Sequence, residues 1–318
     1  MNKPNKHHYV PKCYLNKFCN EQGDIYRLNI DDYLSIKRVN PTAICYESSF
    51  YSIDDEIKSK FATLNDRDEM EVESDILAKI ESNYNRLYEQ IISGKSLPWK
   101  EATSFSEFIV LLKTRTKFWR EKIIRKTIED NVDRIAQDLL ADSHKHERFR
   151  RFPEDLRRLG VTNSTNVYKT DPVALKYLQM HRLMSMGEPN FQKEIIQAMM
   201  NSRWTLVINE TSLPFVTTDN PGVSFNTKTA AVHSVGFNGE FVFMLPLSPK
   251  HLLRIDCTKK DISNNSSKAI TIDHPNINVI EMINRQLIHI TDSIIIASDR
   301  ECLDRYKGII AHHRLVHG

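Results

Sequence analysis

Glycine, long apolar runs and paired cysteines are all scarce in this sequence. Only nine glycines occur among 318 residues, which argues against a glycine-rich solenoid and against a glycine-rich phosphate loop. No run of 18 apolar residues occurs, so we expect no transmembrane helix and no membrane partner. The opening MNKPNKHHYVPK lacks the apolar segment of a secretory signal. We therefore expect a cytoplasmic protein.

The pattern of cysteines and the absence of three familiar catalytic motifs exclude further classes of protein. Five cysteines, an odd number, occur, and none forms a C-x-x-C motif. The spacing of Cys13 and Cys19 fits no common zinc knuckle, so we expect free thiols in a reducing compartment. The motifs G-x-S-x-G, H-E-x-x-H and G-x-x-x-x-G-K-[ST] are absent, so serine hydrolases, zincins and P-loop enzymes are unsupported.

The composition is that of a globular chain, but its charge is uneven. Apolar residues make up 40% and charged residues 27%, with a net charge of +3. An acidic run spans 66–81, and basic runs span 113–126 and 144–158. Basic faces attract phosphate backbones, although a solvated helix face explains such runs equally well. The candidate nucleic-acid-binding residues are Lys113, Lys117, Arg120, Arg148, Arg150 and Arg151.

Three regions follow one another along the chain. Residues 1–60 carry the HHYVP motif and a predicted strand pair at 24–29 and 35–39. Residues 61–203 are predicted to be helical, and residues 204–318 mix strands with helices and carry a D-N-P motif. This order predicts an α+β fold, with a helical middle inserted between β-containing ends in one compact domain.

Helical periodicity is strongest in the middle region. Apolar residues recur at helical spacing over 70–91, and a second helix is predicted to begin at Ser104, where Glu107 completes a capping box. Arg115 falls on the apolar stripe of that second helix. A charge in this position must be paired or must line a cavity. Glu81 borders the stripe of the first helix, so it can reach a cavity or face solvent.

The last region predicts several turn-bounded strands and a helix that follows Pro275. A short buried strand follows the helix at 293–298, and a last helix begins near Ser298. The strands predicted before Pro275 are 204–208, 214–218, 230–237, 241–247 and 252–256.

Two adjacent histidines, His7 and His8, are the first candidate for chemistry. Neutral imidazoles bind transition metals or act as general bases near pH 7. Neighbouring side chains on an extended segment point to opposite sides, so one ring can take a metal while the other faces a water. The alternative is a mobile terminal pair, but the packable sequence YVPKCYLNKF follows at once.

The segment 217–221, TTDNP, is the second candidate. It follows a predicted strand and carries Asp219 and Asn220, and Pro221 forces the residue before it out of the helical region. Strand ends commonly present polar groups to a cleft. From spacing alone, an Asx turn that closes a hairpin explains this segment better.

Several stretches together resemble the DUF4238 family of bacterial and phage-borne proteins. They are HHYVPKCYLNKF, the strand pair, TTDNP and MLPLSP, and the resemblance runs from about residue 6 to about residue 300. Arg115 and Asn284 lie in LLKTRT and MINRQ, which also resemble the family. The resemblance implies an accessory cytoplasmic protein, with anti-phage defence as a role of some members. The residues that it places in one site are His7, His8, Asp219 and Asn220.

HHYVP is also similar to the HHIVP start of the HNH, or His-Me finger, nucleases. This similarity implies a metal ligand at His7 and a general base at His8, with the metal stabilising the leaving phosphate oxygen. The chain departs from the nuclease pattern because no histidine occurs between His8 and His144. Asp219 or Glu81 would have to supply the missing ligands.

Two functions are therefore expected from the sequence. The first is a metal-dependent nuclease or phosphodiester hydrolase that acts on DNA or RNA, serves anti-phage defence and forms a homodimer. Its cofactor would be divalent Mg, Mn or Zn. The expected metal ligands are His7, His8, Glu81 and Asp219, and the expected catalytic residues are His8, Arg115, Asp219 and Asn220. The alternative is a non-catalytic binding or sensor protein in which the HH and DNP motifs are structural.

Overall fold

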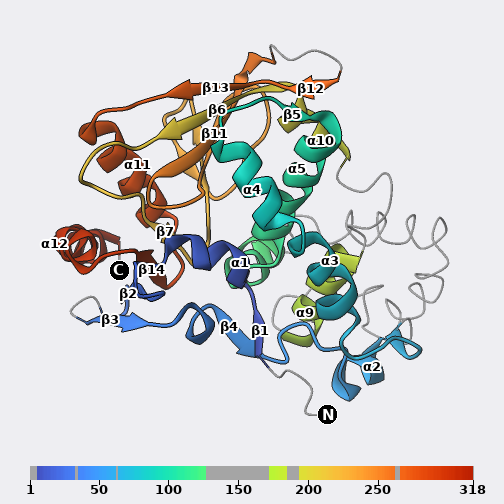
Figure 1. The fold of residues 1–318 in the computed structure, drawn as a ribbon. Helices are drawn as coiled ribbons and strands as arrows, with labels where there is room; N and C mark the ends of the chain where they lie inside the picture. The colour runs from blue at the N-terminus through green and yellow to red at the C-terminus, as the bar shows by residue number, and fades with distance from the viewer. Residues whose placement is uncertain are drawn as a thin grey trace.

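A computed structural model describes most of the chain. Its described residues are 6–32, 35–61, 64–126, 172–184, 193–261 and 266–317. Helices and several sheets alternate along these residues, so the predicted α+β class is confirmed (Figure 1). Within this part of the chain, no helix is both long and apolar enough to cross a bilayer.

The N-terminal segment pairs with the C-terminal part of the chain. The predicted strand pair is confirmed as the antiparallel strands β2 (Ile25–Asn29) and β3 (Ile36–Val39). Strand β2 also pairs with β14 (Ile294–Ala297), which pairs in turn with β7 (Thr217–Thr218). The other N-terminal elements are β1 (Lys6–His8), α1 (Lys12–Leu15), η1 (Asn16–Phe18), η2 (Pro41–Ala43) and β4 (Tyr46–Ser48), the partner of β1.

The helical middle is more broken than the sequence pattern predicts. The helix predicted over 70–91 divides into the π-helical turn η4 (Val72–Leu77), α3 (Ala78–Glu81) and α4 (Tyr84–Ile92). π-Helical turns are uncommon in proteins and are frequent at functional sites. The side chains of η4 are therefore candidates for a functional site.

Helix α5 (Trp99–Thr114) is the centre of the fold, and its predicted start at Ser104 is wrong. The helix begins directly after Pro98, whose fixed φ suits a helix entrance, and Ser104 lies in the second turn. Apolar side chains are buried on all sides of α5, which is typical of a core helix. The remaining helical elements of this region are α2 (Asp55–Lys60), η5 (Trp119–Ile124), α9 (Pro172–Met184) and α10 (Lys193–Met200).

A six-stranded sheet forms most of the C-terminal part. Its order is β13-β6-β11-β10-β8-β9, and all neighbours are antiparallel except the parallel pair β13–β6. The strands predicted at 214–218 and 230–237 shrink to β7 and to β9. The strands of this sheet are β6 (Ser202–Ile208), β8 (Val223–Asn226), β9 (Val232–His233), β10 (Phe241–Pro246), β11 (His251–Lys260) and β13 (Ile270–Asp273).

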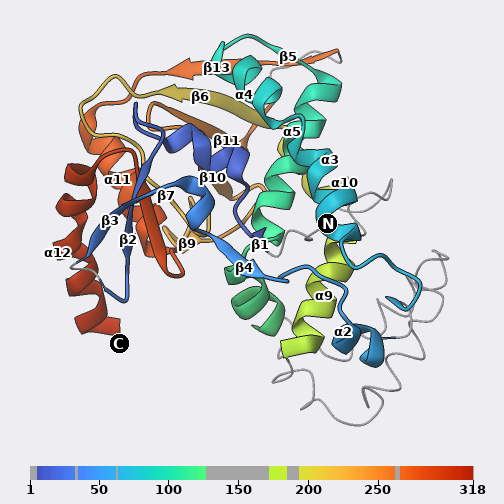
Figure 2. The ribbon, with the colours of Figure 1, turned by 60° about the horizontal axis from the view of Figure 1, so that its bottom comes forward.

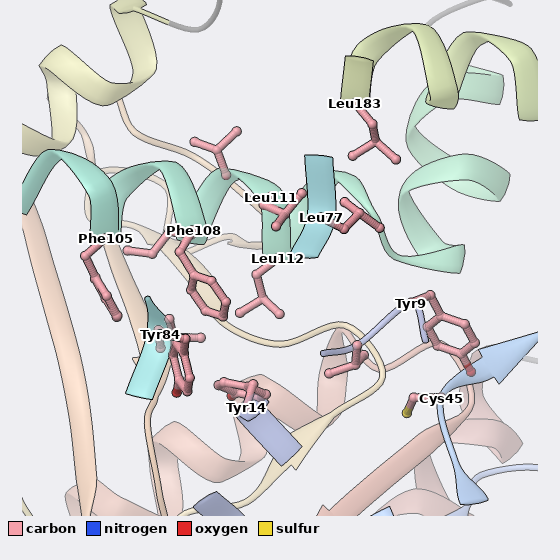
Figure 3. Packing of buried hydrophobic residues seen from close by; sticks show 14 of the residues in the cluster. Tyr9, Tyr14, Cys45, Leu77, Tyr84, Phe105, Phe108, Leu111, Leu112 and Leu183 are labelled. Carbon is pink, nitrogen blue, oxygen red and sulfur yellow. The ribbon is translucent and has the colours of Figure 1, made fainter. Parts of the chain in front are cut away.

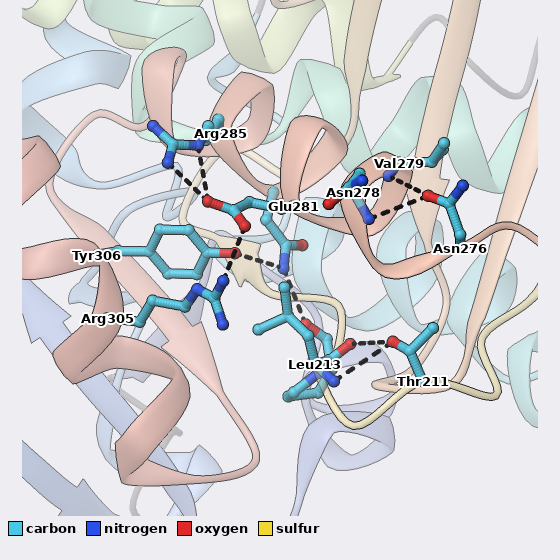
Figure 4. Close-up of polar contacts among 11 residues, drawn as sticks. Thr211, Leu213, Asn276, Asn278, Val279, Glu281, Arg285, Arg305 and Tyr306 are labelled. Carbon is cyan, nitrogen blue, oxygen red and sulfur yellow. Dashed lines mark hydrogen bonds and ion pairs between the residues drawn. The ribbon is translucent and has the colours of Figure 1, made fainter.

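The helix predicted after Pro275 is confirmed as α11 (Ile277–His289). The Asn276 side chain caps it by accepting hydrogen bonds from the backbone N–H groups of Asn278 and Val279 (Figure 4). The last helix is α12 (Arg300–His317), and a small sheet pairs β12 (Ser267–Lys268) with β5 (Leu97–Pro98).

Two hydrophobic clusters cover opposite faces of the six-stranded sheet. On one face, Trp204, Leu206 and Ile255 join a cluster with α5, in which the rings of Tyr84 and Phe108 lie 4.3 Å apart (Figure 3). On the other face, Val207 and neighbouring side chains join a cluster with α11 and α12. Figure 2 places α11 and α12 on one side of the sheet and α4, α5 and α10 on the other.

Candidate functional site

Asp219 lies directly after β7 and holds the loop that leads into β14. Its carboxylate accepts the backbone N–H groups of Asp292, Ser293 and Ile294 at 3.1, 2.7 and 3.0 Å. The side chain is buried. Burial, and after it the charge of Asp292, raises the pKa of Asp219 to about 7, against the opposing effect of the backbone hydrogen bonds. Both oxygens of this predicted catalytic residue therefore serve the backbone.

Asn220 and Lys113 form a second group of buried hydrogen bonds beside Asp219. We call the hydrogen bonds of each residue, Asp219 and Lys113, a latch. The Lys113 ammonium donates to Asn220 Oδ1 at 2.7 Å and to the carbonyls of Pro221 and Gly222, both at 2.9 Å. Asn220 Nδ2 donates to the Ile290 carbonyl at 2.9 Å. Burial lowers the pKa of Lys113, and the charge of Asp219 opposes this shift. Three acceptors match the three N–H groups of the charged form, so the latch is complete when Lys113 is protonated.

The two histidines point into different surroundings. His7 Nδ1 accepts the backbone N–H of Tyr51 at 2.9 Å, and its ring stacks on the Tyr51 ring with centroids 6.0 Å apart. The His8 ring lies against Tyr46 and is hydrogen-bonded to the backbone of Thr42. Burial, followed by the charge of Lys12, lowers the pKa of His8 to about 4, so this imidazole is neutral at pH 7.

Arg115 is fully buried and ties the histidine segment to the helical middle. Its guanidinium forms an ion pair with Glu81 and donates to the His8 carbonyl, and it lies 5.8 Å from the Tyr51 ring centroid. Tyr51 in turn donates its hydroxyl to the Arg115 carbonyl. The prediction that Arg115 must be paired or line a cavity is confirmed by this ion pair, and Glu81 faces the interior at this point.

Three buried polar atoms in this area have no hydrogen-bond partner among the described residues. They are His8 Nε2, Arg115 Nε and Glu73 Oε2. Glu73 comes from the π-helical turn η4, and burial raises its pKa while Arg115 opposes the shift. Arg115 and Glu81 each interact electrostatically with His8, with Glu73 and with one another. We call these four residues the His8 cluster.

Side chains from the stretches singled out in the sequence meet at the end of α5. Lys113 and Arg115 are two residues apart, and they reach the TTDNP loop and the HHYVP segment respectively. Tyr14 donates its hydroxyl to the Pro246 carbonyl at 2.7 Å and lies 2.8 Å from Thr217 Oγ1. HHYVPKCYLNKF, LLKTRT, TTDNP and MLPLSP are thus linked by hydrogen bonds.

Asn284 from the MINRQ stretch completes this linkage on α11. Its Oδ1 accepts the Val216 N–H at 3.1 Å, and its Nδ2 donates to the Pro214 carbonyl and the Tyr306 hydroxyl. Figure 4 shows the Tyr306 hydroxyl directed toward α11 from the neighbouring helix. Asn284 therefore holds the strand entry that precedes TTDNP.

Two of the predicted nucleic-acid-binding residues do not lie on an exposed basic face, so the prediction is wrong for them. Lys113 is buried in the latch with Asn220, and Arg120 is buried against Phe50, with its guanidinium carbon 3.5 Å from the ring centroid. Arg120 Nε also donates to Gln179 Oε1 at 2.6 Å. Lys117 is half-exposed but pairs with Glu47 at 2.6 Å. Arg148, Arg150 and Arg151 lie outside the described residues.

The predicted metal ligands are not gathered around one point. Among the described residues, no three His, Cys, Asp or Glu side chains lie close enough together to hold a metal ion. Asp219 binds backbone N–H groups, Glu81 binds Arg115 and His7 binds Tyr51. His8 keeps a ring nitrogen without a partner within the described part of the chain. The divalent metal stays a prediction.

Two members of the site were not predicted from the sequence. Glu73 belongs to a run of seven acidic residues, and only its apolar neighbours Val72 and Ile76 indicated that this part of the run is buried. Tyr51, which contacts both His7 and Arg115, was visible only as part of an aromatic pair with Phe50.

Comparison with known proteins gives the family of the chain. The family described as protein of unknown function (DUF4238) matches residues 6–301, which is nearly the whole sequence, so the chain belongs to this family. No curated protein matches the chain, and no solved structure does. The predicted family is therefore confirmed.

Proposed function

We propose that this member of the DUF4238 family is a binding or sensor protein in which the HHYVP and TTDNP motifs are structural. The observation that carries the proposal is the engagement of Asp219, whose two carboxylate oxygens accept three backbone N–H groups. These bonds occupy three of the roughly four lone-pair sites of the carboxylate, and a metal ligand or general base also needs access to the group on which it acts. Asp219 is only 3% exposed.

The energetics of the latches support the same proposal. Turning Asp219 toward a substrate would leave three N–H groups without their acceptor, and for the buried N–H of Ile294 alone this costs about 1–3 kcal/mol. Moving Asn220 would likewise strip the Lys113 ammonium of an acceptor. The TTDNP motif thus stabilises the fold most when both of these side chains stay in place.

Stability measurements on matched variants test this proposal. Asp219→Ala is expected to lower the melting temperature by several degrees, because it opens the latch to β14. The control is Asp304→Ala, which removes an aspartate with a 43% exposed side chain and is expected to leave the melting temperature nearly unchanged. An Asp219→Ala protein as stable as the control would contradict the structural role.

A second candidate function is the metal-dependent phosphodiester hydrolase, acting on DNA or RNA in anti-phage defence. His8 Nε2, which has no hydrogen-bond partner in the described part of the chain, favours it, because a neutral, buried imidazole beside Arg115 has the chemistry of a general base. In this function Asp219 would only position the loop. His8 would act on the reacting groups together with the metal.

A cleavage assay separates the two functions. Wild type, His8→Ala and the exposed-histidine control His233→Ala would be incubated with plasmid DNA, single-stranded DNA and total RNA. Each reaction would contain Mg²⁺, Mn²⁺ or Zn²⁺, with EDTA as the metal-free arm. The binding function predicts no cleavage by any protein. Metal-dependent cleavage that His8→Ala abolishes, at unchanged melting temperature, would favour the hydrolase.

A further inference from the structure

A cavity of about 360 Å³ separates α11 from the six-stranded sheet. The helix contributes Val279, Met282, Ile283 and Gln286, which recur at helical spacing and therefore share one face of α11. The buried residues Ile280 and Leu287 lie on another part of the helix, within the cluster with α12. Helix α11 thus shares a cluster with α12 and with the sheet, and beside Val279 and Met282 the sheet face is only partly covered.

The floor of the cavity is one face of the four neighbouring strands β6, β11, β10 and β8. On β11, Leu252 and Arg254 alternate with buried residues that face α5, so they point to the α11 side. Met244 of β10 is paired with Arg254 of β11, and Val242 of β10 is paired with Phe225 of β8. These residues line the cavity with a mainly apolar surface.

The charged residues at the rim neutralise one another. Arg254 pairs with Asp273 at 3.0 Å, and Lys259 pairs with Asp256 at 3.4 Å. Two cations and two anions leave no net charge to attract an ionic ligand. A neutral ligand therefore fits this rim better than a charged one.

The helix side offers one polar group and one adaptable side chain. Gln286 lines the cavity, and its amide Oε1 has no hydrogen-bond partner among the described residues. Met282 faces the cavity but is 50% exposed, and it also lines a second cavity of about 440 Å³ on its other side. A flexible thioether in this position can move to admit ligands of different shape.

We propose that this cavity binds a neutral, mainly apolar small molecule that hydrogen-bonds to the side-chain amide of Gln286. The cavity volume falls in the range of small-molecule sites and is too small for a folded partner. The MINRQ stretch supplies both Met282 and Gln286, while its Asn284 serves the fold. This inference rests on the proposed binding function and gives its ligand a chemical class.

Fluorescence titration of the full chain with N-phenyl-1-naphthylamine tests the site, because this probe is neutral and apolar and carries one N–H donor. Wild type is expected to bind it saturably. Met282→Trp fills the cavity and is expected to raise Kd at least tenfold. Ile277→Trp is the control, since it adds the same ring to a 37% exposed position on α11 outside the cavity and should leave Kd unchanged.

A second variant examines the hydrogen bond. Gln286→Leu keeps the size of the side chain and removes its acceptor, so Kd is expected to rise about threefold to tenfold. Absence of saturable binding, equal Kd values for Met282→Trp and Ile277→Trp, or tighter binding of the anionic 8-anilinonaphthalene-1-sulfonate would each overturn the proposal. These results leave the structural role of TTDNP to its own melting test.

Discussion

Lys113 and Arg115 are two buried cations only two residues apart, yet they occupy different kinds of surroundings. The Lys113 ammonium meets three neutral acceptors and has no donor left over. The Arg115 guanidinium pairs with the Glu81 carboxylate and a carbonyl, but its Nε has no partner within the described residues. The Lys113 latch is therefore closed, whereas the His8 cluster keeps polar atoms available for a ligand or a water.

The largest expected effect comes from opening the closed latch. Lys113→Met would leave two carbonyls without their buried donor and would leave Asn220 Oδ1 with Ser234 as its donor, and we expect the free energy of unfolding to fall by about 3–5 kcal/mol. Urea denaturation followed by circular dichroism measures this loss. A loss below about 1 kcal/mol would mean that Lys113 is not the organising group of the TTDNP loop.

A pH titration of stability sharpens the contrast at His8. The folded ring takes up a proton only near pH 4, whereas the unfolded ring does so near its ordinary pKa of 6.5. Stability from this group is therefore present above pH 6.5 and is lost as the pH falls toward 4. His8→Asn is expected to lose about 3 kcal/mol less than wild type over this window.

Urea denaturation of both proteins at pH 7.5 and pH 4 measures the difference. The opposite slope expected from Asp219 is common to both proteins and cancels in the comparison. Parallel losses in wild type and His8→Asn would show that the ring titrates normally in the fold.

The Arg115 ion pair is expected to depend on the shape of the guanidinium. In Arg115→Lys, one ammonium can reach Glu81 or the His8 carbonyl but not both, so stability should fall by about 1–3 kcal/mol. The matched control is Lys113→Arg, in which a planar group must enter a site built for three converging bonds. Thermal unfolding of both variants measures the effect, and an Arg115→Lys protein as stable as wild type would contradict it.

Two substitutions with smaller expected effects test one hydrogen bond beside the Lys113 latch and one ion pair at the surface. Ser234→Ala removes a single hydrogen bond to Asn220 Oδ1 and should cost about 1 kcal/mol. Lys117→Ala removes a half-exposed ion pair with Glu47 and should cost less than about 1 kcal/mol. Chemical denaturation can measure the loss of stability in Ser234→Ala. A larger loss in Lys117→Ala than in Ser234→Ala would contradict the placement of Ser234 in the interior and Lys117 at the surface.

The sequence predicted local structure better than it predicted burial. The β2–β3 pair and α11 followed from alternation, helical periodicity and Pro275, which are local signals. Lys113 was expected on a basic surface because a lysine in a helix is usually solvated, and its three acceptors lie more than a hundred residues further along the chain. The start of α5 was misplaced because Ser104 and Glu107 imitate a capping box inside a helix.

The candidate site was predicted in part for the same reason. The pairing of Arg115 followed from its place on an apolar stripe, whereas its partners could not be chosen from spacing alone. The use of both Asp219 oxygens by the backbone depends on the loop before β14, a segment distant in sequence.

The sheet shared by the two ends of the chain has a consequence for biosynthesis. Strand β2 leaves the ribosome well before its partner β14, because the whole helical middle and the six-stranded sheet lie between them in the sequence. Until then, the inner edge of β2 lacks its neighbour, and such unpaired edges favour aggregation. A nascent chain of this protein therefore stays vulnerable until β14 has been made, and truncation before residue 294 would make that state permanent.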